Sequence, residues 1–296
     1  MPKITQFTVI VMRNVILVHG SWHASWCWAL ITPQLAARGV PSVAVDMDGH
    51  GLAAHSPASR WSRPFDPAAF VTERSSVADV TIASAAASLL AQIRQIGRGE
   101  PCVVVAHSMS GVIATAAAEQ EPSLFAALVY LAAFAPVAGL PATAYESDAV
   151  SDTVSDTGND GGGVPALLAA DPAAVGTFRI DVGDPERHAL IRETFFNDVE
   201  PGLADAAVGL LTPDTPLAIV TESPTVTAAR YGAVPHAYIT CAKDNAIPLD
   251  VQRRFIREID AISTTPTQVF DLDSSHSPFL SQPATLADAI AAVASR

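Results

Sequence analysis

The sequence predicts an α/β fold in which a mostly parallel sheet is flanked by helices on both faces. Short β-branched runs alternate with longer alanine-rich segments of helical periodicity, which is typical of sheets built from successive β-α units. The β-branched runs are apolar throughout, as expected for strands buried on both faces. With 296 residues, of which 49% are hydrophobic, the chain is long enough to bury a large core.

Six strands and five helices follow from these patterns. The strands are predicted at Val15–Val18, Ser42–Val45, Cys102–Val105, Leu128–Leu131, His236–Thr240 and Gln268–Leu272. The helices are predicted at Ala29–Ala37, Val77–Ile96, Val112–Glu119, Val251–Ile259 and Leu286–Ala294. Gly39 and Gly97 follow the first two helices, and we expect each to be the left-handed residue that ends its helix.

The regular alternation stops between about Pro136 and Pro235, where glycine, proline and aspartate become frequent. A long insertion near the ligand-binding edge of a sheet is most simply a cap over the site. We therefore expect an α/β core at 1–136 and 233–296 and a cap at 137–232. Residues 146–163 are rich in glycine, serine and valine, which favours a solvated loop over a helix that would stack carboxylates around a cation. The four regularly spaced carboxylates there are Asp148, Asp152, Asp156 and Asp160.

The charge balance excludes several classes of partner. The formal charge is −13, from 17 basic and 30 acidic residues, so we expect no binding to nucleic acid or to an anionic membrane. Only Lys3 and Lys243 are lysines, and no P-loop motif is present.

Gly49–Ala54 fits a dinucleotide fingerprint, but prolines rather than a helix follow it, so we interpret it as a structural turn. No H-E-x-x-H or comparable ligand spacing occurs, and we expect neither a cofactor nor a metal.

Cysteine usage and apolar segments bear on location. Three scattered cysteines, Cys27, Cys102 and Cys241, do not form a disulfide scaffold and suit a reducing compartment. The apolar stretch Phe7–Met12 has no signal-peptide cleavage site. Leu124–Leu140 is broken by proline and is shorter than the roughly 20 residues of a membrane span. We therefore expect a cytoplasmic protein, and its alanine-rich, lysine-poor composition is typical of GC-rich bacterial genomes. The sequence leaves the oligomeric state open.

The first chemical motif joins a strand to a helix through Ala106-His-Ser-Met-Ser110. A nucleophilic serine on a sharp strand-to-helix turn needs small residues two positions before and after it. Ala106 and Ser110 meet this requirement, although glycine is usual at both places. A serine that merely caps an ordinary helix is the alternative. We predict that Ser108 is the nucleophile.

A serine hydroxyl needs a histidine base, and the histidine needs an orienting carboxylate. Asp244 follows the predicted strand His236–Thr240, and His276 follows the last predicted strand. The chain order Ser108, Asp244, His276 is that of an α/β-hydrolase. All three residues follow the carboxyl ends of strands that we expect to be neighbours, so we predict that they form a catalytic triad. A surface-loop histidine and a helix-capping aspartate are the alternatives.

An oxyanion hole needs two backbone donors near the nucleophile. We predict the amides of Met109, directly after the nucleophile, and of Ser21, in the loop after the first strand. His19 is expected to bond loop backbone rather than act as a second base. Trp22 has two possible positions, the core and the substrate pocket. With Trp22 in the second position, the predicted substrate pocket contains Gly20, Trp22 and His107.

Several segments carry a family resemblance. Val18–Trp28, Ala44–Gly51, the turn at Ser108, Lys243–Arg253 and Ser275–Pro283 resemble the plant methyl esterase and hydroxynitrile lyase family and its bacterial relatives, which include pyrethroid-hydrolysing carboxylesterases. The resemblance covers the predicted core and fades across the predicted cap. It implies an α/β-hydrolase fold and transfers the reaction class better than the substrate.

Two positions distinguish the lyases of that family from its ester hydrolases. In the plant lyases a threonine follows the histidine of the first motif and a lysine follows the catalytic histidine; Gly20 and Ser277 stand there instead. Without the lysine, no cation holds a departing cyanide. The resemblance therefore implies a serine carboxylic-ester hydrolase acting on a small to medium hydrophobic or aromatic ester. A lyase or cyclase using the triad as general base, or a ligand-binding receptor on a hydrolase scaffold, is the alternative.

Overall fold

The protein is built around one six-stranded parallel sheet. The computed structural model describes residues 13–145 and 164–295; the apolar stretch Phe7–Met12 and the aspartates between 146 and 163 lie outside them. The strand order is β2-β1-β3-β4-β7-β8, and every neighbouring pair is parallel. The strands are β1 (Val15–Val18), β2 (Ser42–Val45), β3 (Cys102–His107), β4 (Phe125–Leu131), β7 (His236–Cys241) and β8 (Gln268–Leu272). The predicted α/β class is thereby confirmed.

Burial along the strands explains why they were visible in the sequence. All residues of β1, β3 and β7 are buried, whereas the edge strands β2 and β8 include exposed positions. The sheet order also corrects one expectation. Strands β7 and β8 are neighbours, but β4 lies between β3 and β7, so the segments that follow β3 and β7 are separated by one strand.

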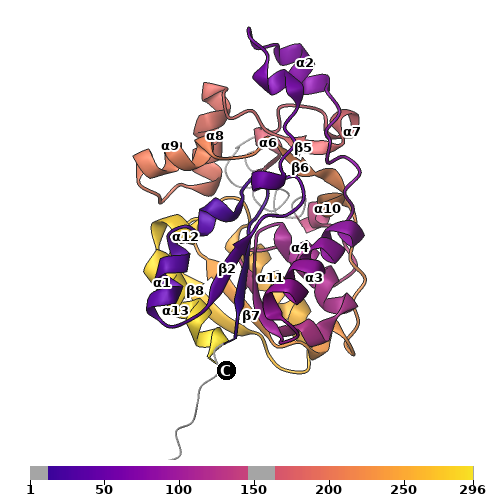
Figure 1. The fold of residues 1–296 in the computed structure, drawn as a ribbon, viewed down its shortest axis with the longest axis vertical. Helices are drawn as coiled ribbons and strands as arrows, with labels where there is room; N and C mark the ends of the chain where they lie inside the picture. Colours follow the sequence, from indigo (N-terminus) through magenta and orange to yellow (C-terminus); the bar gives the residue numbers. More distant parts are fainter. Residues whose placement is uncertain (1–12, 146–163, 296) are drawn as a thin grey trace, which may run out of the picture.

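Helices cover both faces of the sheet (Figure 1). Helices α1 (Ile31–Ala37) and α13 (Pro283–Ala294) pack together on one face, and α3 (Ile82–Gly97) and α4 (Ser110–Gln120) pack together on the other. Helix α11 (Leu249–Ile262) packs against β7, and the short helix α12 (Pro278–Ser281) precedes α13. The buried apolar side chains of these elements form one continuous core.

Helix α3 differs from its prediction at both ends. It begins at Ile82 rather than Val77, because Thr81 caps it and forms a reciprocal capping box with Ser84. At its other end Gly97 is still helical, and Arg98 is the left-handed residue, with φ of 52°. A Cβ on Gly97 would lie 2.9 Å from the Cys102 sulfur, so glycine is required there for packing and not for the turn. Gly39 is left-handed as predicted, with φ of 72°.

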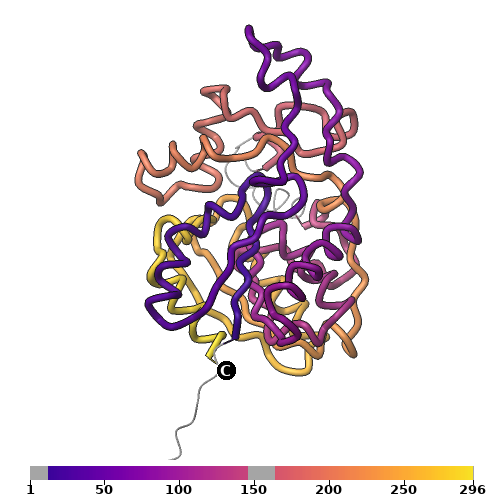
Figure 2. The backbone as a smooth tube through the Cα atoms, in the orientation of Figure 1, coloured from indigo at the N-terminus to yellow at the C-terminus, as the bar shows by residue number. Residues whose placement is uncertain are grey.

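A second layer of short elements lies over one edge of the sheet (Figures 1 and 2). Among the described residues it contains a two-stranded antiparallel sheet and several short helices from the segment that the sequence assigned to the cap. The elements are α6 (Val164–Leu167), α7 (Pro172–Val175), β5 (Thr177–Arg179), α8 (Pro185–Phe195), α9 (Pro201–Gly209), β6 (Asp214–Pro216) and α10 (Leu217–Thr221).

Helix α2 (Pro67–Thr72) joins this layer, although the sequence placed it in the core segment (Figure 1). The connection is the fully buried side chain of Arg179, which forms two hydrogen bonds with Asp214, at 2.7 and 2.8 Å. Arg179 also donates to the backbone carbonyls of Phe70 and Glu73. A buried charge of this kind must be fully paired, so Arg179 ties α2 to the β5–β6 sheet.

Candidate active site

Ser108 lies on a sharp turn between β3 and α4 and has a left-handed backbone, with φ of 54°. This conformation costs roughly 1–2 kcal/mol for a residue with a side chain. The turn is clamped because the Ser108 amide donates to the Leu131 carbonyl, at 3.2 Å, and the Ser108 carbonyl accepts from the amides of Gly111 and Phe134, each at 3.1 Å. A Cβ on Gly111 would lie 2.1 Å from the Phe134 carbonyl oxygen, so only glycine fits there. The geometry is that expected of a nucleophile elbow.

The two small residues around the turn serve different purposes. Ala106 is fully buried in β3. Ser110, at a position where glycine is usual, donates its hydroxyl to the backbone carbonyl of His19. Gly20, the next residue, approaches the turn so closely that a Cβ would lie 2.7 Å from the Ser108 Cβ. The serine at 110 therefore fastens the loop after β1 to the turn that carries Ser108.

The structure brings His276 and Asp244 together. His276 Nδ1 lies 2.8 Å from Asp244 Oδ2 in a fully buried contact. The other oxygen, Asp244 Oδ1, accepts from the backbone amides of Ala246 and Ile247, at 2.8 and 2.9 Å. The buried side chain of Gln252 donates to Asp244 Oδ2, at 3.3 Å. Every oxygen of the carboxylate is thus bonded, and its orientation toward His276 is fixed.

Two residues that follow α8 hold the loops that carry this pair, and no pattern in the sequence indicated them. Asn197 donates to the backbone carbonyl of Lys243, at 3.0 Å, directly before Asp244. Asp198 Oδ2 accepts from the backbone amide of Ser275, at 3.0 Å, directly before His276. These partners are backbone atoms, so no residue type marks them. Gln252, in contrast, stood within the Lys243–Arg253 motif and was detectable as a polar residue on the buried face of α11.

His107 does not lie in the substrate pocket, contrary to the assignment from sequence. Its side chain is fully buried beneath His276, because neighbouring positions at the end of a strand point to opposite sides. His107 Nε2 donates to the backbone carbonyl of His276, at 3.0 Å, and the two ring centroids are 4.5 Å apart. Burial, and next the proximity of His276, place the pKa of His107 well below its usual value. His107 therefore supports His276 from below as a neutral ring.

The two predicted oxyanion donors come from two segments: Ser21 lies in the loop after β1, and Met109 follows Ser108 in the turn between β3 and α4. His19 bonds loop backbone as expected: Nδ1 donates to the Gly20 carbonyl, at 2.8 Å, and Nε2 accepts from the Met47 amide, at 3.1 Å. Burial, with a further contribution from His50, lowers the pKa of His19 to about 3. Among the described residues, the amides of Ser21 and Met109 donate to no protein acceptor. Both residues line the cavity beside Ser108.

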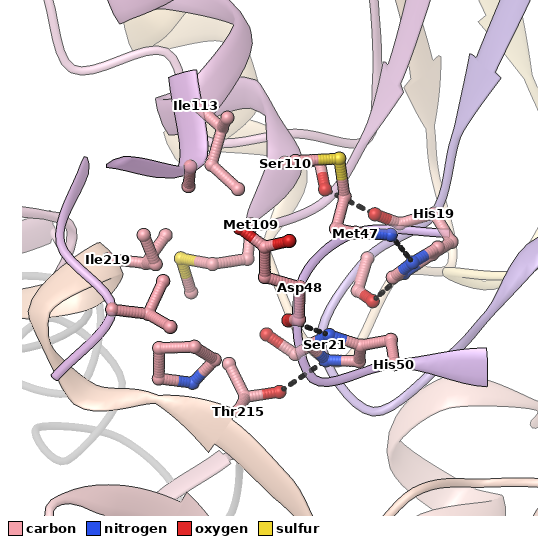
Figure 3. Close-up of a pocket in the computed structure, with 14 residues that line it drawn as sticks. His19, Ser21, Met47, Asp48, His50, Met109, Ser110, Ile113, Thr215 and Ile219 are labelled. Atoms are coloured by element: carbon pink, nitrogen blue, oxygen red, sulfur yellow. Dashed lines mark hydrogen bonds between the residues drawn. The ribbon is translucent and has the colours of Figure 1, made fainter. Parts of the chain in front are cut away.

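Ser21 and Met109 line two small cavities. The cavity beside Ser108 has a volume of about 10 Å³, and its walls include Trp22. The second has a volume of about 20 Å³ and includes Gly20, Ser21 and Met109; Figure 3 shows it. Ligand pockets are typically about 300–1,000 Å³, so both cavities are closed around space for about one water molecule each. A larger groove of about 600 Å³ on the outer layer shares no residue with them.

The cysteines and the remaining sequence motifs can be located in the structure. Cys27, Cys102 and Cys241 are unpaired and buried, and burial raises the pKa of the Cys102 thiol. The Gly49–Ala54 segment forms a turn and one short 3-10 helix at Gly51–Ala53, as expected. Within 13–145 and 164–295, no group of three or more His, Cys, Asp or Glu side chains is arranged to hold a metal ion. No described helix is long and apolar enough to cross a membrane.

Known proteins resemble this chain along almost its whole length. Methylesterase 9 of Arabidopsis thaliana is 25% identical over 292 residues, which cover 96% of this chain and 99% of that protein. A pyrethroid hydrolase of Sphingobium wenxiniae is 27% identical and covers 95% of this chain and 88% of its own length. The crystal structure of a pyrethroid hydrolase from Sphingobium faniae superposes with a TM-score of 0.69 at 24% identity, covering 96% of this chain and 98% of that one. The resemblance drawn from the motifs is thereby confirmed.

A model of the alpha/beta hydrolase family matches residues 15–289. The match includes the strand-to-helix turn at Ser108 and the loops of Asp244 and His276. The parallel sheet with helices on both faces agrees with the same fold. This protein belongs to the alpha/beta hydrolase family.

Proposed function

We propose that this protein is a serine carboxylic-ester hydrolase that acts on a small to medium hydrophobic or aromatic ester. The observation that carries the proposal is the buried 2.8 Å contact of His276 Nδ1 with Asp244, in a fold that also holds Ser108 on a strained turn. Relatives named methylesterase and pyrethroid hydrolase support ester hydrolysis as the reaction.

The mechanism is a two-step acyl transfer. Asp244 holds the proton of His276 on Nδ1, which leaves Nε2 as the base. Nε2 removes the proton from Ser108 Oγ, which attacks the ester carbonyl, and the amides of Ser21 and Met109 donate to the resulting oxyanion. His276 then protonates the leaving alcohol and activates the water that hydrolyses the acyl-enzyme.

The cavity beside Ser108 favours an apolar substrate. Phe134, Phe178, Phe195 and Ile247 contribute to its walls together with the Trp22 ring, and none of the described residues that line it is charged. Burying an apolar acyl or alcohol group against such walls stabilises the complex by about 25 cal/mol for each Å² removed from water. A charged ester would lose its hydration there without gaining a partner.

The lysine positions favour hydrolysis over cyanohydrin cleavage. Lys243 is the single lysine among the described residues, and its ammonium pairs with the Asp273 carboxylate, at 2.8 Å, on the surface. Ser277, which stands where the plant lyases have lysine, is fully buried. The described site thus offers no lysine to hold a departing cyanide.

We further propose that residues 137–232 act as a cap. Their described elements lie over the edge of the sheet where Ser108 is exposed to the cavity (Figure 1). A cavity of about 10 Å³ has no room for an ester. Cap elements or their side chains must therefore shift when the substrate binds.

The proposed setting is a reducing, cytoplasmic one with a small-molecule ester as the partner. Three unpaired, buried cysteines support the reducing compartment. The charge of −13 gives no support to nucleic acid or anionic lipid as a partner.

Methyl, aryl and lactone esters assayed with wild type and with Ser108→Ala test the proposal. The substitution should lower kcat by about 10⁴- to 10⁶-fold, as for other serine triads, and mass spectrometry should detect a covalent adduct on Ser108 after phosphonate trapping. Near wild-type turnover of the variant would overturn the proposal. Turnover without any adduct would indicate general-base lyase or cyclase chemistry, and tight binding with very slow turnover would indicate a receptor.

A further inference from the structure

Trp22, next to the proposed oxyanion donor Ser21, has a left-handed backbone. Its φ of 60° is costly for a bulky residue and persists only where surrounding contacts enforce it. All of these contacts come from the outer layer. The Trp22 amide donates to Thr215 Oγ1, at 2.9 Å, and its carbonyl accepts from the Thr212 amide, at 2.8 Å. The indole N–H donates to the Phe178 carbonyl, at 2.9 Å.

The contacts determine where the Ser21 amide points. One planar peptide unit joins the Ser21 carbonyl to the Trp22 amide, and these two groups face opposite ways. The carbonyl accepts from His23 Nδ1, at 2.8 Å, and the Trp22 amide donates to Thr215 on the other side. The Ser21 N–H belongs to the preceding peptide unit, whose Gly20 carbonyl accepts from His19 Nδ1, at 2.8 Å. With the following unit also held at both ends, the two dihedral angles at the Ser21 Cα have little freedom, and the direction of the Ser21 N–H is maintained.

The Thr215 hydroxyl is itself held in one orientation. It accepts from the Trp22 amide, so its own proton is available to His50 Nε2, at 3.2 Å. His50 Nδ1 donates to the Asp48 carbonyl, at 3.0 Å, which leaves Nε2 as an acceptor. Burial lowers the pKa of His50 and keeps its ring neutral. Figure 3 shows Thr215 and His50 joined beside Ser21 at the wall of the second cavity.

We propose that Thr215 is a positioning residue for the oxyanion hole. Its hydroxyl, supplied by β6 of the outer layer, holds the Ser21–Trp22 peptide unit so that the Ser21 amide faces the oxyanion formed at Ser108. The inference rests on the proposed esterase function and deepens it, because it makes transition-state stabilisation depend on a strand outside the core sheet. Thr215 is not among the residues that line the cavity beside Ser108, and we infer that it acts through Trp22.

Thr215→Val tests the proposal, since valine keeps the shape of the side chain and removes the hydroxyl. Loss of an oxyanion donor outright costs about 10²- to 10³-fold in kcat, and loss of the group that aims one should cost less, about 10-fold. KM should change little, because the ester is held by the apolar walls. An aryl trifluoromethyl ketone, which forms an oxyanion on Ser108, should bind more weakly by about the same factor. Thr215→Ser, which restores the hydroxyl, should recover most of both losses.

Thr240→Val is the matched control. Thr240 is also buried in a strand, β7, and its hydroxyl donates to Asp271 Oδ1 of β8, at 2.7 Å, and not to the loop after β1, so the kinetics of this variant should match wild type. Thr215→Ala replaces the valine variant if that one does not fold. Wild-type kcat and inhibitor affinity in a folded Thr215 variant, or equal losses in Thr215→Ser and Thr215→Val, would overturn the proposal. Activity of Ser108→Ala would instead overturn the proposed function, so the two failures are separable.

Discussion

Asp244→Asn should abolish most activity, because the hydrogen bonds around the carboxylate determine how an asparagine side chain would be oriented. Asp244 Oδ1 accepts from the amides of Ala246 and Ile247. In the variant, the asparagine oxygen must keep these two donors, which places its NH₂ group where Oδ2 now faces His276. That NH₂ group would then meet the Nδ1–H of His276. The imidazole must move its proton to Nε2 to accept from asparagine, and Nε2 can then no longer take the proton of Ser108.

The size of the effect follows from this wrong tautomer. A comparable substitution in other serine triads lowers kcat by about 10⁴, which corresponds to about 5.5 kcal/mol of transition-state stabilisation. Gln252, which now donates to Asp244 Oδ2, would also face the new NH₂ group. The free energy of unfolding should therefore fall by about 1–3 kcal/mol. The measurements are kcat on p-nitrophenyl esters, urea unfolding, and ¹⁵N chemical shifts of His276, which report the tautomer.

Asp198→Asn is the matched carboxylate-to-amide control. Asp198 accepts from the Ser275 amide, and an asparagine oxygen can keep that bond, so we expect only a several-fold loss of kcat. An Asp244→Asn variant that loses no more activity than Asp198→Asn would refute the tautomer reasoning. So would a His276 that still carries its proton on Nδ1 in the inactive variant.

Two further predictions follow from the packing around the site. Gly20→Ala would place a Cβ 2.7 Å from the Ser108 Cβ and 2.8 Å from His107 Nδ1. The substitution should therefore lower kcat, and it should lower the free energy of unfolding by about 1–3 kcal/mol. Wild-type values in ester assays and in urea unfolding would contradict this prediction. Burial lowers the pKa of His19 and that of His23 from 6.5 to about 3. Between these values the unfolded chain binds more protons than the folded one, so acid destabilises the fold by about 1.4 kcal/mol per pH unit for each ring. These two rings alone should make the free energy of unfolding about 4 kcal/mol lower near pH 5 than near pH 7.5, and equal values at both would refute the assignment of neutral buried rings.

The sequence was sufficient to predict the six strands of the central sheet and the residues that follow them, but not β5 and β6 of the outer layer. Continuous apolar runs revealed the buried strands, and the motifs around Ser108, Asp244 and His276 fall where β3, β7 and β8 end. Strand ends of a parallel sheet meet at one edge, so chain order and spacing were enough to expect the His276–Asp244 contact. The intervening position of β4 was not predictable, because no local pattern encodes the order of strands in a sheet.

The contacts from the outer layer were not predictable for a different reason. Arg179 bonds the carbonyls of Phe70 and Glu73, and Asn197 bonds the carbonyl of Lys243. When the distant partner is a backbone atom, the residue type at that position carries no information about the contact. Propensity and periodicity report only on nearby positions. The same limit explains why α2 was assigned to the core segment.

The histidines around Ser108 differ in the group that each ring bonds. All five rings are buried, and burial lowers the pKa of His19, His23, His50 and His107. Each bonds a neutral backbone carbonyl: His19 to Gly20, His23 to Ser21, His50 to Asp48 and His107 to His276. A carbonyl dipole offsets little of the cost of charging a ring that is removed from water. His276 alone among the five bonds a carboxylate, which stabilises the imidazolium that forms when a proton is taken up. The surrounding rings therefore support the loops as neutral groups, and in the proposed mechanism the reaction proton goes to the ring that faces Asp244.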